Sequence, residues 1–245
     1  MIKNKKTILN KLKDDDLYYG SYGQQFLSNS DISVLLKDPL SLHKEFLISP
    51  ALLIGRLFHL SILEEHKVKS LKVIDSTSRN TKVYKEQSQG ELCLLRKEVD
   101  NVKSMVDKIQ ETDMSRDLIN PNNCDYEVPQ ITDIMGNTWK GKSDVVNHKE
   151  GLIIDLKTSA DISKFRNSAF KYNYDSQAYI YNKLFGLDML FIVIDKTTHQ
   201  IGMFDCSDEF YASGKNKVRR ATEAYNLFYL TEGFNPKQYF VSKTL

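Results

Sequence analysis

Two short stretches give the strongest indication of the fold: Gly-Lys-Ser-Asp-Val-Val at residues 141–146 and Ile-Ile-Asp-Leu-Lys-Thr at residues 153–158. Side chains on a β-strand alternate between its two faces. Asp155 and Lys157 therefore project from the same face, while their apolar neighbours pack on the other. A turn separates the two stretches, which predicts a hairpin that brings Asp144 close to Asp155 across the strand pair.

This arrangement of acidic side chains predicts a metal site. Two carboxylates held together repel each other unless a cation lies between them, and hard oxygen ligands favour Mg²⁺ or Mn²⁺. Lys157 beside them can position a water molecule or stabilise charge on a phosphate. An Asp-x-Lys triplet alone is a weak signal, so its meaning depends on the rest of the chain.

Periodicity around the two stretches predicts a mixed β-sheet with helices on both faces. The predicted strands cover residues 126–131, 138–147, 152–157, 189–195 and 201–206, and the predicted helices cover residues 163–170, 174–185 and 208–230. This part of the chain, from residue 124 to residue 245, is expected to form the sheet and its covering helices.

The upstream part, residues 28–120, is expected to be helical. Helices are predicted over residues 32–37, 52–65 and 91–110, and the second is apolar on nearly all sides, which is typical of a helix inside a protein. Residues 67–90 are polar and charged and are predicted to form a long, mobile loop. Residues 1–27 are interpreted as a polar, solvated arm.

The composition of the chain excludes few classes of protein or partner. The 245 residues carry 34 Lys and Arg against 32 Asp and Glu, a formal net charge of +2, which neither supports nor excludes nucleic acid as a partner. Three scattered cysteines predict neither a disulfide framework nor an all-cysteine metal site, and they favour the cytoplasm. We expect no signal peptide and no membrane span.

The strand–turn–strand with Asp144 and Asp155-Leu156-Lys157 resembles the core of PD-(D/E)xK nucleases. Gln177 and Tyr181 lie four residues apart and therefore share one helix face. They are similar to the Q-x-x-x-Y motif that follows the D-x-K strand in the exonuclease branch, which includes the RecB nuclease domain and exonuclease VIII.

Two upstream segments extend the resemblance. Residues 55–64, Gly-Arg-Leu-Phe-His-Leu-Ser-Ile-Leu-Glu, resemble the branch's upstream helix, in which the histidine binds metal. Residues 28–32 followed by Asp38-Pro39 are similar to its first helix. The order and spacing of all the pieces match over residues 28–185, and this joint match carries the resemblance.

The resemblance implies a single PD-(D/E)xK nuclease domain over residues 28–245 that binds one or two Mg²⁺ ions, with Mn²⁺ as a substitute. Its implied metal ligands are His59, Asp144, Asp155 and the backbone carbonyl of Leu156. Lys157 would act beside them in catalysis. Gln177 and Tyr181 would support the site and approach the DNA.

The implied activity is hydrolysis of phosphodiester bonds in DNA by a stand-alone exonuclease of the exonuclease VIII or lambda-exonuclease kind. Such an enzyme would resect linear duplex ends, 5′ to 3′, in a bacterial or phage-infected cell. It would act as a homo-oligomer, a trimer or tetramer, with a single-strand annealing protein as a possible partner. Three scattered cysteines exclude the iron–sulfur cluster of some relatives, and no phosphate-binding motor motif is present.

Several alternatives stay open. His59 could be a core residue on an apolar helix instead of a metal ligand, and Glu127 could face water or lend a further carboxylate. Basic residues are candidates for phosphate contacts or ordinary surface charges; they are Arg79, Lys82, Lys164 and Arg166. An endonuclease on the same core, or a catalytically silent nucleic-acid-binding subunit, would also fit the sequence.

Overall fold

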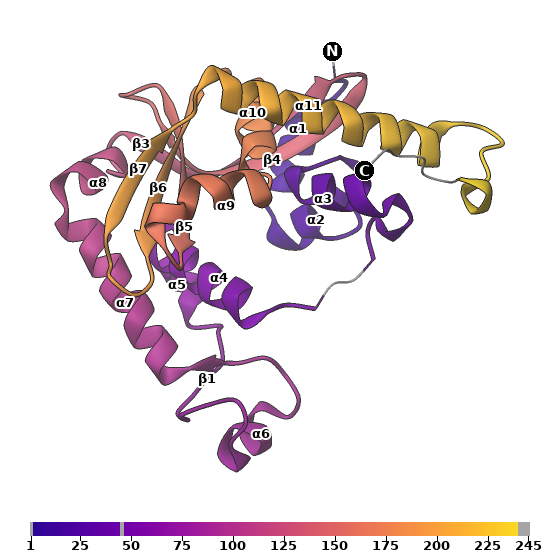
Figure 1. Ribbon diagram of the computed structural model, residues 1–245. Helices are drawn as coiled ribbons and strands as arrows, with labels where there is room; N and C mark the ends of the chain where they lie inside the picture. Colours follow the sequence, from indigo (N-terminus) through magenta and orange to yellow (C-terminus); the bar gives the residue numbers. More distant parts are fainter. Residues whose placement is uncertain (1, 45–46, 240–245) are drawn as a thin grey trace.

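A mixed five-stranded sheet forms the centre of the protein (Figure 1). The computed structural model describes residues 2–44 and 47–239. In sheet order, the strands are β3 Cys124–Ile134, β4 Asn137–Asn147, β5 Leu152–Ser159, β6 Asp188–Asp195 and β7 Ile201–Asp205. The first three form an antiparallel meander, β6 runs parallel to β5, and β7 is antiparallel to β6. The predicted mixed sheet is therefore confirmed.

Helices cover both faces of the sheet. On one face the core includes residues of α3 Asn29–Lys37, α9 Phe165–Lys171, α10 Tyr174–Phe185 and α11 Asp208–Tyr225. On the other face it includes residues of α4 Pro50–Leu63 and α7 Arg96–Glu111. The alternation predicted for β5 is observed, since Ile153 belongs to the first core and its neighbour Ile154 to the second.

A two-residue turn sets the register of β3 and β4. Met135 and Gly136 both have positive φ angles, 53° and 83°, as a type I′ turn requires, and its twist matches that of paired strands. The pairing then runs from Ile134–Asn137 to Cys124–Asn147. This register places the middle of β4 beside the middle of β3.

β4 and β5 pair only at one end and then separate. The pairing joins residues 145–147 to residues 152–154, and further along β4 its free edge is bonded to Leu27 instead. Leu27 N donates to the carbonyl of Thr138, and Lys140 N donates to the carbonyl of Leu27. A gap in the sheet therefore opens between Lys140 and Val145 on the side where β5 has left.

The interpretation of residues 67–90 as a long, mobile loop is wrong. They contain the end of α5 Glu65–Val68, the short strand β1 Val73–Ile74 and α6 Lys82–Ser88. β1 pairs in parallel with β2 Leu94–Leu95, and a small separate core holds Ile74, Tyr84, Cys93 and Leu95. The polar composition hid these few apolar residues, because they are widely spaced along the chain.

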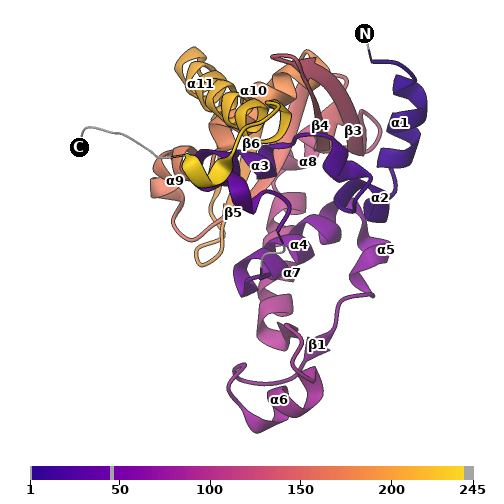
Figure 2. The same cartoon turned by 90° about the vertical axis from the view of Figure 1, so that its right-hand side faces the viewer.

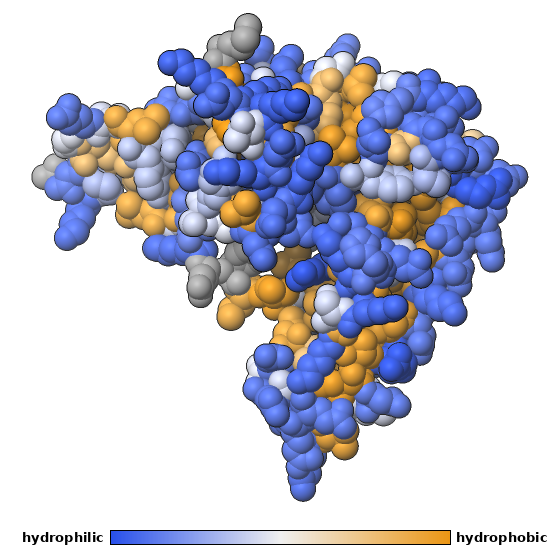
Figure 3. Space-filling model, turned by 180° about the vertical axis from the view of Figure 1, so that it is seen from behind, coloured by the Kyte–Doolittle hydropathy of each residue, from blue (hydrophilic) through white to orange (hydrophobic). Residues whose placement is uncertain are grey.

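The helix predicted over residues 91–110 begins only at Arg96. Leu94 and Leu95 pair with β1 instead of entering the helix, and Glu98 accepts a hydrogen bond from Leu95 N, which caps α7 at this point. We call residues 69–98 the arm. Figures 1 and 2 both show α6 at the end of a projection away from the sheet, and the tip of this projection is mostly hydrophilic in Figure 3.

Residues 2–27 are not the solvated N-terminal segment that their polarity suggested. They form α1 Lys5–Leu12, α2 Asp15–Tyr19 and the turn η1 Gly23–Gln25. Leu12 and Tyr18 are buried against Ile131 of β3. This N-terminal segment is therefore part of the fold.

Smaller differences concern α4 and the ends of helices. Only Leu57, Phe58 and Leu60 of α4 are buried, and Leu52 is 55% exposed, because α7 and β5 cover a single side of this apolar helix.

The sequence-based prediction missed α8 Asp113–Leu118 and ended the last helix too late, since α11 gives way to the π-helical turn η4 Asn226–Leu230. The remaining turns are η2 Pro39–Ser41, η3 Ile162–Lys164 and η5 Pro236–Gln238. Among the described residues, no helix is both long and apolar enough to cross a membrane.

Candidate active site

The predicted catalytic residues gather where β4 and β5 separate. Asp155 and Lys157 lie on β5, and Asp144 lies on the part of β4 that has lost its neighbour. Because the strands diverge there, Leu156 N donates to the side chain of Asp144, Oδ2, at 2.8 Å instead of to a backbone carbonyl. The gap is open to helices from both faces of the sheet.

α10 approaches from one face and holds Asp155. Gln177 Nε2 donates to Asp155 Oδ1 at 2.6 Å, and the ammonium of Lys157 forms an ion pair with Asp155 Oδ2. Lys157 also lies 4.9 Å from the centre of the Tyr174 ring. The side chain of Asp155 is only 4% exposed, so these partners replace water around it.

Tyr181 supports the same gap one helical turn further along α10. Its hydroxyl donates to the carbonyl of Lys142 at 2.9 Å, which binds α10 to the free edge of β4. A Cβ atom at Gly141 would stand 2.9 Å from the Tyr181 ring and 2.5 Å from Leu184. Only glycine at position 141 allows the ring to lie against the strand.

α4 approaches from the other face and brings His59 to Asp144. Nδ1 of His59 lies 3.3 Å from Asp144 Oδ2, and the histidine side chain is 29% exposed. A histidine that packs in a core is normally hidden from solvent, so this one lies at the site and not in the hydrophobic interior. The structure thus brings together all of the predicted side chains on α4, β4, β5 and α10.

The surroundings shift the pKa values of the two carboxyl groups in opposite directions. Burial opposes ionisation of Asp144, but His59, Lys157 and the Leu156 N–H outweigh it and lower the pKa of Asp144. Burial raises the pKa of Asp155, and the negative charge of Asp144 raises it further, although Lys157 opposes both effects. The pKa of Lys157 is raised, because the two carboxylates outweigh its own burial.

Glu127, whose role the sequence leaves open, lies close to Asp144. It lies between the register pairs Tyr126–Val145 and Val128–Ser143, and so opposite Asp144. It is half-buried. Burial and the charge of Asp144 raise the pKa of Glu127 to about 7. Its φ angle of 50° lies in the left-handed region, and no pattern in the sequence predicts that conformation for a glutamate.

Comparison with known proteins places the chain in a family. The model of a PDDEXK-like domain of unknown function (DUF3799) matches residues 42–237. The chain belongs to this PDDEXK-like family. The search of curated proteins finds no match.

A solved structure shares this fold. A crystal structure described as "Putative exonuclease" from Eubacterium rectale is 16% identical and covers 95% of this chain and 95% of its own, with a TM-score of 0.63. At this identity the likeness shows the fold alone. A phage related exonuclease from Haemophilus somnus 129PT is 15% identical over 82% of this chain and 93% of that one, but its TM-score of 0.37 is too low to support any argument.

The donor set of this PDDEXK-like site suits a hard divalent cation. Two carboxylates and an imidazole border one gap, and Asp155 Oδ2 is buried without a hydrogen-bond donor other than its ion-pair partner Lys157. Within residues 2–44 and 47–239, however, no three His, Cys, Asp or Glu side chains converge as a metal site. Asp144 is turned toward His59, and Asp155 toward Gln177 and Lys157. Binding a cation therefore requires the carboxylates to exchange some of these partners.

The predicted DNA contacts are not gathered in the same way. Arg79 is an internal residue of the arm, since it forms two hydrogen bonds with Glu98 at 2.8 and 2.7 Å. Lys82 is exposed at the start of α6, far from the sheet (Figure 1). Lys164 pairs with Asp161 beside the end of β5, and Arg166 is exposed on α9. Only the last two follow closely on the strand that carries Asp155.

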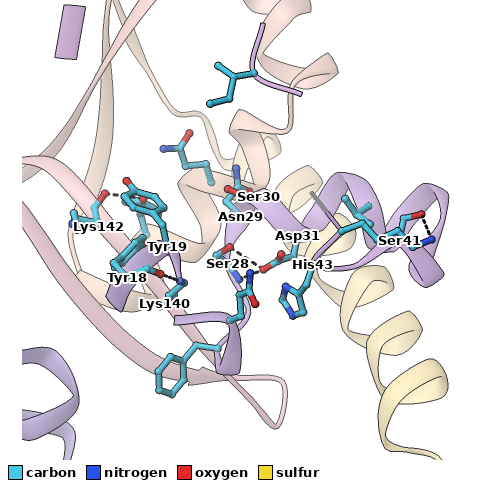
Figure 4. A pocket seen from close by; sticks show the side chains of 17 residues that line it. Tyr18, Tyr19, Ser28, Asn29, Ser30, Asp31, Ser41, His43, Lys140 and Lys142 are labelled. Atoms are coloured by element: carbon cyan, nitrogen blue, oxygen red, sulfur yellow. Dashed lines mark hydrogen bonds between the residues drawn. The ribbon is translucent and has the colours of Figure 1, made fainter. Parts of the chain in front are cut away.

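A cavity of about 730 Å³ adjoins the site through Gln177 and Tyr181. Its walls come from the N-terminal segment, α3 and β4, and Figure 4 shows Tyr18 and Tyr19 beside Lys140 and Lys142. The ammonium groups of these lysines lie 4.2 and 4.6 Å from the centre of the Tyr18 ring. No sequence pattern predicts this cavity, because the polar composition of the N-terminal segment suggests a solvated segment and not a wall.

Proposed function

We propose that this protein is a Mg²⁺-dependent DNA exonuclease that hydrolyses phosphodiester bonds at the ends of linear duplex DNA. The observation that carries the proposal is the meeting of Asp144, Asp155 and Lys157 in the gap between β4 and β5. Membership of the PDDEXK-like family supports it. A Eubacterium rectale protein with the same fold is described as "Putative exonuclease", which agrees with the proposal.

Each side chain has a part that follows from its contacts. Asp144 and Asp155 would hold the cation, with His59 and the backbone carbonyl of Leu156 as further ligands. Mg²⁺, when bound, polarises the scissile phosphate and lowers the pKa of the attacking water. Lys157 keeps its positive charge beside them and can orient that water or balance charge on the phosphate.

Gln177 and Tyr181 position these groups. Gln177 fixes one oxygen of Asp155, and Tyr181 fixes the backbone of β4 two residues before Asp144. Such support matters, because small displacements of catalytic groups cost large factors in rate. We further propose that degradation runs 5′ to 3′, and that the protein forms a homo-oligomer that can work with a single-strand annealing protein.

The test is digestion of linear duplex, labelled at either the 5′ or the 3′ end, beside a closed circle in Mg²⁺. We expect loss of the 5′ label from the linear DNA first, an intact circle, and no reaction in EDTA. Nicking of the circle would indicate an endonuclease, and two intact substrates would indicate a binding subunit.

Asp155→Asn supplies the matched loss-of-function variant. It should retain the fold and lose activity by a factor of about 10³ or more, since a metal-ligand role is worth several kcal/mol in the transition state. Asp125→Asn is the control, because Asp125 is an exposed carboxylate that pairs with His148. Activity of Asp155→Asn above about a tenth of wild type would contradict the assignment.

A further inference from the structure

The arm, a single projecting element, carries a surplus of positive charge. Residues 69–98 contain seven Lys and Arg (Lys69, Lys72, Arg79, Lys82, Lys85, Arg96 and Lys97) and four Asp and Glu (Asp75, Glu86, Glu91 and Glu98), a net charge of +3. Since the chain totals +2, all remaining residues together sum to −1. A surplus in one projecting element is a focused field, unlike lysines scattered over a neutral surface.

Most of these basic groups are available to a partner. Lys69, Lys72, Lys85 and Arg96 are exposed and form no ion pair among the described residues. Lys82 is 89% exposed, and its contact with Glu86 at 3.7 Å is long. Exposed pairs of this kind contribute little and exchange readily for a phosphate.

Arg79 is the exception, and it explains why the arm is a defined surface. Its guanidinium joins Glu98 at the start of α7 and donates to the carbonyl of Cys93 at 3.1 Å. Tyr84 packs in the small core, and its hydroxyl accepts from Cys93 N at 2.8 Å. The arm is therefore folded before any partner arrives, so its lysines are presented without a large ordering cost.

The arm is also fixed relative to the candidate site. α4, which carries His59, packs on both α7 and β2. α7 begins in the arm and runs back along the sheet; its 16 residues correspond to about 24 Å. A B-form duplex covers that length in about seven base pairs, at about 3.4 Å each.

We propose that the arm is a duplex-binding surface that holds the phosphate backbone of DNA whose end lies in the candidate site. The inference rests on the proposed function, because it takes duplex DNA as the substrate. It assigns the contact to Lys72, Lys82 and Lys85, and it assigns Arg79 to the architecture of the arm. Since phosphate contacts carry no sequence information, the surface would bind any sequence.

The test compares two DNA lengths in EDTA, so that binding is measured without cleavage. The probes are a fluorescent blunt duplex of about 30 base pairs and a hairpin of about six base pairs, which at about 20 Å is shorter than α7. The variant is Lys72→Gln/Lys82→Gln/Lys85→Gln. The matched control is Lys5→Gln/Lys6→Gln/Lys13→Gln, which removes three exposed lysines from the N-terminal segment.

We expect the arm variant to bind the long duplex about tenfold or more weakly at low salt, and the slope of log affinity against log salt to fall by up to about 2.7, or about 0.9 per contact. Hairpin affinity and melting temperature should match the control. An unchanged slope on the long duplex, or an equal loss in the control, would overturn the proposal and leave the arm to a different partner, such as an acidic protein. A separate Mg²⁺ digestion of both probes distinguishes this failure from failure of the proposed function, because an inactive protein can still show the slope change and an active one can lack it.

Discussion

Asp144 and Asp155 share one gap, yet their ionisation is stabilised by different groups. Asp144 is held anionic by His59 and by the Leu156 N–H. Asp155 is more deeply desolvated and relies on Lys157 for the charge that favours its ionised form. A cation between them would stabilise both anions at once and relieve their mutual repulsion. In the metal-free protein, Lys157 therefore supplies part of the positive charge that a bound cation would supply.

His59 provides a prediction that separates metal binding from packing. His59→Ala should weaken Mn²⁺ binding by about tenfold or more and change the melting temperature of metal-free protein very little, because the side chain is 29% exposed. Calorimetric titration with Mn²⁺ and thermal unfolding in EDTA measure the two effects.

Leu57→Ala is the control on the same helix. Leu57 is 2% exposed, so its truncation should cost about 2–5 kcal/mol of stability and leave Mn²⁺ affinity nearly unchanged. The ligand assignment fails if His59→Ala behaves like Leu57→Ala, with lost stability and normal metal binding.

At the scale of residues, the sequence predicted which side chains meet but not how they meet. The two-residue period of β5 was enough to place Asp155 and Lys157 on one face, and the four-residue spacing on α10 was enough for Gln177 and Tyr181. The divergence of β4 from β5 could not be predicted, because it depends on Leu27 occupying the edge of β4 more than a hundred residues from its own position. The left-handed backbone of Glu127 could not be predicted either, since no sequence pattern marks it.

At the scale of elements, the N-terminal segment binds the two halves of the site together. Asp15 of α2 pairs with Lys142 of β4 at 2.5 Å and with Lys67 of α5 at 2.6 Å. Lys142 is 5% exposed and Asp15 is 38% exposed, so this contact is partly sheltered from solvent. A single carboxylate therefore connects the strand that carries Asp144 to the helix that follows α4.

The arm supplies a prediction at the same scale. Arg79→Ala should destabilise the protein by about 1–3 kcal/mol, because it leaves Glu98 half-buried without its partner. Lys82→Ala, also on the arm, should change stability by less than about 0.5 kcal/mol. Urea unfolding of the two variants measures the difference, and equal values would mean that Arg79 is an ordinary surface charge.

Elements with a strong period were predictable, and elements held by single contacts were not. The bounds of α10, residues 174–185, agree with the prediction, because an apolar stripe and the terminal Gly186 mark both its face and its end. The arm has neither signal. Its two-residue strands and its ion pair between Arg79 and Glu98 depend on partners 19 or more positions away, which local patterns do not record.

At the scale of the whole molecule, charge bears on how the protein stays on DNA. A single chain has a net charge of only +2, although the arm alone carries +3. On α11, Lys217 is not available to a partner, since it pairs with the buried Asp175. One chain therefore offers few phosphate contacts, and these contacts supply most of the non-specific affinity for DNA.

This shortage leads to the prediction that the protein works as a ring-like trimer or tetramer that encloses the duplex. A closed ring cannot leave a long duplex sideways, so it stays on the DNA even when each contact is weak. Light scattering at micromolar protein should then give a mass of about three or four chains of 28.3 kDa. Digestion of labelled duplex should continue after excess unlabelled duplex is added as a trap.

The arm variant separates a ring from a monomer. A ring should keep its processivity after the loss of three lysines, whereas a monomer held by charge alone should lose it. A monomeric mass together with release after a few nucleotides would contradict the ring and leave the nuclease proposal standing.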